Sequence, residues 1–101
     1  EKFAGTVVTY TANGFTPASI PLKQNQTGDG CYVKILNQSN ESLLVRISPY
    51  SEKDNRGYPY PAIHPGDSQF IDPRYTALEE KFHNRNNPKQ EFSVRMDKNC
   101  F

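Results

Sequence analysis

Apolar residues occupy every second position in two stretches of this chain, residues 43–48 and 91–97, and the positions between them are mainly polar. Side chains of a β-strand point alternately to its two faces, so this period of two predicts two strands that each bury one face. Runs of β-branched, aromatic or other apolar residues predict further strands at residues 7–11, 18–23, 31–36 and 69–71.

Turn-forming residues separate these stretches. A Pro-Gly turn at residues 64–67 precedes the short strand at 69–71, and the polar segment 38–42 predicts a hairpin between the strands on either side. Roughly six to eight short strands with such turns are typical of an all-β, two-sheet antiparallel sandwich with Greek-key or related topology. We expect a single domain of this kind over residues 1–101.

One segment departs from the strand pattern. Thr76-Ala-Leu-Glu79 matches a capping box, in which the Thr76 side chain accepts from the Glu79 amide and Glu79 reaches back to the Thr76 amide. The motif predicts a short helix over residues 76–82.

The charges of the chain are nearly balanced. Its 101 residues include 12 Lys and Arg and 11 Asp and Glu, which gives a formal net charge of +1. This balance provides no large net positive charge that would attract nucleic acid or an anionic membrane. No apolar run approaches the roughly 18 residues needed to cross a bilayer. We therefore expect no nucleic-acid partner, no membrane insertion and a monomer.

The cysteines indicate a cellular compartment. Cys31 and Cys100 are the only two in the chain, and they enclose most of the predicted strands. Because hydrophobic residues make up only 35% of the chain, its small core gains from a covalent tie, and we expect these cysteines to form a disulfide. Disulfides persist in oxidising surroundings, so we expect a secreted, extracellular protein.

Three Asn-x-Ser/Thr sequons fit a secretory route. They begin at Asn25, Asn37 and Asn40, in polar stretches that we expect to be surface turns carrying glycosylation sites. The alternative is chance, because a chain rich in Asn and Ser produces such triplets at random.

The long segment 49–66 is the candidate contact surface. It interleaves prolines with tyrosines, and ordered loops of this length often carry binding function. Tyrosine and arginine are enriched where interfaces concentrate binding energy. The alternative is that the tyrosines fold back over the open end of the sandwich. The candidate partner-binding residues are Tyr50, Lys53, Arg56, Tyr58 and Tyr60.

Catalytic and metal sites have little support in the sequence. No Gly-x-Ser-x-Gly elbow exposes a serine, and no base is placed to activate Cys31, so we expect no catalytic residue and no enzyme activity. The two histidines, His64 and His83, are not part of an i,i+4 pair or a Cys-x-x-Cys motif that would gather metal ligands. We expect neither a cofactor nor a bound metal.

Several segments together resemble the small cupredoxins. Asn13-Gly-Phe-Thr-Pro-Ala-Ser-Ile20 resembles their opening, and residues 33–37 resemble the strand that follows. Residues 63–68 resemble a later turn, and 82–88 with 92–94 resemble the ligand loop and the closing strand. The resemblance covers most of the chain and implies a cupredoxin-like β-sandwich.

The cupredoxin ligand set is incomplete in this sequence. The resemblance implies an imidazole on the strand after the hairpin, then a thiolate, a second imidazole and often a thioether on the final loop. A leucine or valine of residues 43–45 stands at the first position, and the final loop offers His83, Asn84 and Asn87 without a thiol. The resemblance therefore implies a degenerate cupredoxin-like sandwich without the blue-copper site.

Two functional hypotheses follow. The first is a small secreted, non-catalytic binding protein, of effector or elicitor type or another extracellular interaction module. It would contact an extracellular protein or a cell-surface partner through the segment 49–66. The alternative is a cupredoxin-like metal-binding or redox protein that uses His64 and His83.

Overall fold

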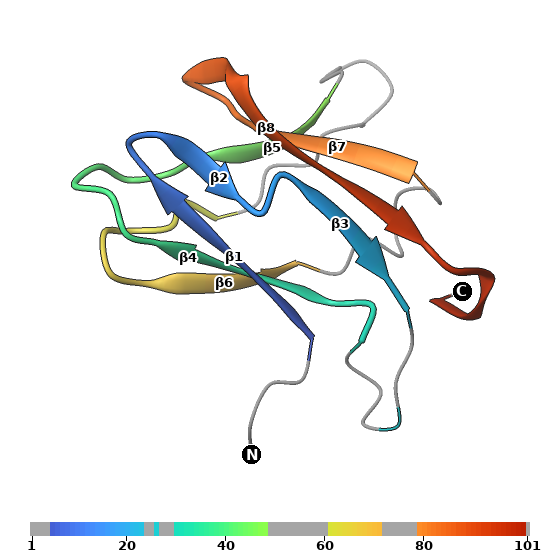
Figure 1. Ribbon diagram of the computed structural model, residues 1–101. Coiled ribbons are helices and arrows are strands. Elements are labelled where there is room, and N and C mark those ends of the chain that lie inside the picture. Colours follow the sequence, from blue (N-terminus) through green and yellow to red (C-terminus); the bar gives the residue numbers. More distant parts are fainter. Residues whose placement is uncertain (1–4, 24–25, 27–29, 49–60, 72–78, 101) are drawn as a thin grey trace.

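Two four-stranded sheets pack face to face in the described part of the chain, as Figure 1 shows. The computed structural model describes residues 5–23, 26, 30–48, 61–71 and 79–100. The prediction of an all-β, two-sheet sandwich is confirmed. Within these residues no helix has the length and apolarity needed to span a membrane.

Four strands form the first sheet: β1 (Thr6–Thr11), β2 (Gly14–Thr16), β4 (Val33–Asn37) and β6 (Ser68–Ile71). Their order across the sheet is β2-β1-β4-β6. Strand β1 pairs antiparallel with β2 and in parallel with β4, while β4 and β6 are antiparallel.

The second sheet consists of β3 (Ser19–Leu22), β5 (Val45–Ser48), β7 (Glu79–Asn84) and β8 (Asn87–Met96). They lie in the order β3-β8-β7-β5, and a 3₁₀ turn, Lys98–Cys100, follows β8. Strands β3 and β8 are parallel, whereas the other two pairs are antiparallel. Each sheet thus contains one parallel pair, which the expectation of an antiparallel sandwich did not include.

The predicted hairpin across residues 38–42 is wrong. Strand β4 belongs to the first sheet and β5 to the second, so this segment crosses between the sheets. After the crossing, Leu43 forms an isolated bridge with Ile63, and its side chain is 1% exposed. Burial of Leu43 between the layers takes the chain away from β4 before a hairpin can form.

The predicted helix over residues 76–82 is wrong for residues 79–82, which belong to β7, and residues 76–78 lie outside the described residues. Glu80 and Phe82 are buried, whereas Glu79 and Lys81 are exposed, which is strand alternation. Strand β7 pairs along its whole length with β8. This long-range pairing overrides the local preference that the capping box expresses.

The core lies between the two sheets and is richest in aromatic rings at its centre. Phe82 and Phe92, from neighbouring strands, stack with ring centroids 5.2 Å apart. Phe15 of the first sheet packs edge-on against Phe92 at 4.9 Å and contacts Tyr10 at the same distance. These rings join the two layers in one continuous core.

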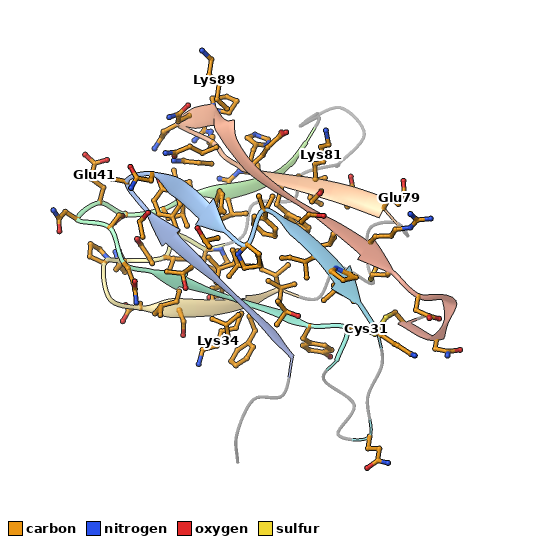
Figure 2. The ribbon with its side chains drawn as sticks, viewed as in Figure 1. Cys31, Lys34, Glu41, Glu79, Lys81 and Lys89 are labelled. Atoms are coloured by element: carbon orange, nitrogen blue, oxygen red, sulfur yellow. A yellow bond between two sulfur atoms is a disulfide. The ribbon has the colours of Figure 1, made fainter. Side chains whose placement is uncertain are left out.

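The predicted disulfide is confirmed. Cys31 lies just before β4, and Cys100 lies in the turn after β8, with their Cα atoms 5.7 Å apart. The bond therefore ties the first sheet to the second. Its two cysteines are 0% and 1% exposed, and Cys31 is labelled in Figure 2.

Candidate functional site

Three turns meet at one end of the sandwich and enclose a pocket of about 410 Å³. They are the β1–β2 turn, the β4–β5 crossing and the β7–β8 turn, which Figure 1 shows at the same end of the molecule. In Figure 2, Glu41 and Lys89 mark this end, and Cys31 lies at the other end. The disulfide and the pocket are therefore separated by the length of the strands.

A closed network of hydrogen bonds forms the floor of the pocket. The Tyr10 hydroxyl donates to Oε1 of Gln90 at 2.7 Å. Nδ2 of Asn84 donates to the Tyr10 hydroxyl at 2.9 Å and to Oε1 of Gln90 at 3.0 Å. Nε2 of Gln90 in turn donates to the carbonyl of Ala12 at 3.1 Å. Tyr10 and Asn84 are buried, so this network fixes the β1–β2 turn relative to the β7–β8 turn.

Asn37 shapes the wall of the pocket. Its side chain is 0% exposed, and Nδ2 donates to the carbonyl oxygens of Glu41 and Ile63 at 2.8 and 2.7 Å. Oδ1 of Asn37 accepts from the backbone N–H of Ser39 at 2.9 Å and from its hydroxyl at 2.6 Å. One buried amide thus holds residues 39–41 in place.

The rim of the pocket is polar and exposed. It carries the side-chain amides of Asn40, Asn86 and Asn87 and the carboxylate of Glu41. None of the three amide groups makes a hydrogen bond with another residue in the described ranges. Each therefore retains two donors and an acceptor for a ligand.

Of the three predicted glycosylation sites, the structure describes Asn37 and Asn40, and it places them in different environments. Asn25 lies outside the described residues. The expectation that Asn37 lies on a surface turn is wrong, because its amide is buried and both of its N–H groups are engaged. Asn40 is exposed on the pocket rim, where a sequon is accessible.

The predicted partner-binding residues, Tyr50, Lys53, Arg56, Tyr58 and Tyr60, all lie outside the described residues. The described end of their segment, residues 61–66, lies beside the pocket wall. Ile63 pairs with Leu43 and accepts a hydrogen bond from Asn37, and the His64 ring lies 3.2 Å from the Ser42 hydroxyl.

The two histidines lie on different elements of the described structure. His64 is exposed on the turn before β6, whereas His83 is 8% exposed within β7. In the described ranges, no three His, Cys, Asp or Glu side chains are grouped closely enough to hold a metal ion.

His83 is a buried imidazole between two charged neighbours. In the strand register it lies opposite Arg46 of β5 on one side and Glu91 of β8 on the other. Its Nδ1 has no hydrogen-bond partner in the described structure. Burial lowers the pKa of His83 below its ordinary value of 6.5, Glu91 opposes this shift, and Arg46 adds to it. The folded protein therefore favours the neutral ring.

We expect the protein to lose stability as the pH falls through about 6.5, the ordinary pKa of histidine. Because the pKa of His83 is lower in the folded chain, the unfolded chain takes up the proton first, so stability is complete above this pH and declines below it. Urea unfolding at pH 7.5 and pH 5.5 measures the effect. In the His83→Gln variant the decline should be smaller, and an equal decline in both proteins would contradict this origin.

The structure closely matches solved copper proteins. A purple cupredoxin from Nitrosopumilus maritimus aligns with a TM-score of 0.64 and 10% identity, over 91% of this chain and 99% of its own. An oxidised mutant of amicyanin aligns with a TM-score of 0.71 and 11% identity, over 96% and 86% of the two chains. The fold is that of a cupredoxin.

A larger enzyme contains a similar cupredoxin-like domain. The copper-containing nitrite reductase from Thermus scotoductus aligns with a TM-score of 0.67 and 12% identity, over 93% of this chain and 22% of its own. No protein-family profile matches the sequence, and no curated protein matches it. At these identities the similarity establishes the cupredoxin-like fold alone.

The residues of this chain do not fit the copper site that a cupredoxin fold implies. Both cysteines form the disulfide, so no thiolate exists to bind copper. The final loop of this cupredoxin-like sandwich contributes amide groups to the pocket instead of soft donors, and Asn84 among them is bonded to Tyr10 and Gln90. Copper favours thiolate, thioether and imidazole ligands, whereas amides are poor substitutes.

The sequence reasoning missed the pocket floor. Tyr10, Asn84 and Gln90 come from three strands and are separated by up to 80 positions in the chain. The signal present in the sequence was the polar run at residues 84–87, which is unusually rich in asparagine for a short turn.

Proposed function

We propose that this chain is a small secreted, non-catalytic binding protein that contacts an extracellular partner with the pocket end of its sandwich. The observation that carries the proposal is the pocket itself. Its floor is fixed by Tyr10, Asn84 and Gln90, and its rim presents unpaired amides. Among the described residues that line the pocket there is no histidine, cysteine or lysine.

The proposal also assigns partner contacts to the segment 49–66. Its described end is anchored to the pocket wall through Ile63 and His64. The tyrosines at positions 50, 58 and 60 serve as aromatic anchors for the partner, and Lys53 and Arg56 as polar contacts. The partner is an extracellular protein or a cell-surface molecule, as in an effector or elicitor.

Secretion is supported by the state of the cysteines. Both cysteines of the chain are joined in one buried disulfide, and neither remains as a free thiol. A single disulfide that closes most of a small domain is typical of oxidising compartments.

Replacing Tyr58 and Tyr60 together by alanine should weaken partner capture by about tenfold or more and leave the melting temperature nearly unchanged. The reason is that interface tyrosines concentrate binding energy without supporting the core. The measurement combines capture of extracellular proteins by the immobilised variant with a thermal melt. The matched control is Lys23→Ala, an exposed change beyond β3 that should affect neither property.

Two outcomes would contradict the proposal. A large fall in the melting temperature of the double tyrosine variant would show that these side chains belong to the core. Stoichiometric copper binding, seen by visible absorption and calorimetry and lost in His83→Ala, would instead favour a metal-binding or redox protein.

A further inference from the structure

The pocket has the size of a small-molecule site and a preorganised floor. Its volume of about 410 Å³ lies within the usual range for ligand pockets of roughly 300–1,000 Å³. Tyr10, Asn84 and Gln90 bond to one another, so a ligand that enters need not order the floor. The remaining polar capacity therefore lies at the rim.

The charge of the pocket argues against an ionic ligand. Among the described residues that line it, Glu41 is the only charged one, and Lys89 extends outward from the same end in Figure 2. An anion would meet the Glu41 carboxylate without a compensating cation. An organic cation would find no aromatic cage among the described lining residues, where Tyr10 is the one aromatic side chain and is only 8% exposed.

The rim groups match hydroxyl groups. Asn40, Asn86 and Asn87 each present both donors and an acceptor, while Glu41 presents acceptors only. A hydroxyl group both donates and accepts, and two neighbouring hydroxyls can donate to the two oxygens of one carboxylate. A ligand with several hydroxyls on a compact ring can satisfy groups that converge from separate turns.

We propose that this pocket binds a neutral, hydroxyl-rich ligand, the exposed end of a glycan. The inference rests on the proposed binding function and names its ligand class. An extended peptide fits less well, because the free groups surround a compact hollow instead of following a line along a strand edge. The ligand is held at the rim by Asn40, Glu41, Asn86 and Asn87, above the fixed floor.

The state of Asn40 determines how the test is prepared. Asn40 begins a sequon and lies on the rim, so a glycan attached to it would cover the pocket. The full chain is therefore produced in a bacterial periplasm, which forms the disulfide without attaching N-linked glycans.

The test is an NMR titration of the ¹⁵N-labelled protein with maltose, cellobiose, chitobiose, lactose and mannobiose. Each is added to about 50 mM, well above a millimolar Kd. At least one disaccharide should produce saturable shifts in the side-chain amides of Asn86 and Asn87 and in the three turns. Trigalacturonate and a tyrosine-rich hexapeptide are the charged and peptide probes, and neither should bind as tightly.

Variants assign the binding to the pocket. Asn87→Ala and Glu41→Ala should each weaken the best disaccharide by about tenfold, the effect of losing one good hydrogen bond. Lys89→Ala is the matched control, since Lys89 lies at the same end without lining the pocket. It should bind as the wild type does, and a thermal melt confirms that each variant is folded.

The outcomes separate this inference from the proposed function. No saturable binding of any disaccharide, tighter binding of either other probe, or unchanged affinity in both pocket variants would overturn the glycan assignment. If that occurs while the tyrosine variant still loses its protein partner, the binding function stands without the glycan. If disaccharides bind but the double tyrosine variant captures proteins as the wild type does, the glycan assignment of the pocket is retained. The segment 49–66 is then not the contact surface.

Discussion

Replacing Cys31 and Cys100 together by alanine is expected to lower the free energy of unfolding by about 4 kcal/mol. The disulfide closes a loop of 69 residues, so its removal frees the unfolded chain to sample many more conformations. Both cysteines are also buried against the core, and alanine leaves space where the sulfur atoms packed. A small domain has only about 5–15 kcal/mol in total, so this loss is severe.

Urea unfolding followed by circular dichroism measures the loss. Wild-type protein with a strong reductant should approach the stability of the double alanine variant, whereas the same reductant should leave the variant itself unchanged. A difference below about 1 kcal/mol between the oxidised wild type and the variant would contradict the prediction, because the chain-entropy effect alone is several times larger.

The position of the disulfide separates stability from binding. The bond ties the sheets at the end opposite the pocket, and the pocket floor has its own cross-links between β1, β7 and β8. Loss of the disulfide therefore acts on the population of folded molecules, and those that remain folded retain the pocket. The pocket and the covalent tie are independent parts of the same fold.

The strands were predictable from the sequence because burial on one face imposes a period of two. The stretches 43–48 and 91–97 lie largely within β5 and β8, and the core positions Val45, Ile47 and Phe92 follow the pattern. The alternation depends only on which side faces the core. For this reason the alternation is visible in the sequence whichever strand lies beside it in the sheet.

The partners of those strands were not predictable in the same way. A polar segment such as 38–42 is equally compatible with a hairpin and with a crossing between sheets, and the choice depends on where Leu43 finds its buried bridge to Ile63. The capping box at Thr76 gave a similar error. The motif is a local signal, and it did not reveal that residues 79–84 pair continuously with β8.

The pocket was hidden for a related reason. A buried amide and an exposed amide have the same letter in the sequence, and only the fold distinguishes Asn37 from Asn40 three positions later. Tyr10 and Gln90 meet only because β1 ends and β8 begins at the same end of the sandwich. The composition could indicate a polar turn, but it could not predict that these side chains lie close together in the fold.

Asn37→Asp should lower the free energy of unfolding by about 3 kcal/mol, although the two side chains have nearly the same shape. In the wild type, Nδ2 of Asn37 donates to the carbonyl oxygens of Glu41 and Ile63. Aspartate replaces this donor by an oxygen, so two carbonyls lose their partner and face a buried negative charge. The side chain is 0% exposed, so water cannot compensate.

Asn40→Asp is the matched control, because it makes the same chemical change at an exposed position of the same segment. It should alter the free energy of unfolding by less than about 0.5 kcal/mol in the same urea experiment. Equal stability of the two variants would contradict a structural role for the buried Asn37 amide.

A glycan on Nδ2 of Asn37 would also replace one of these donors and has no space at 0% exposure. Glycopeptide analysis of the secreted protein should therefore find Asn37 unmodified, and Asn40 is the accessible acceptor of the two.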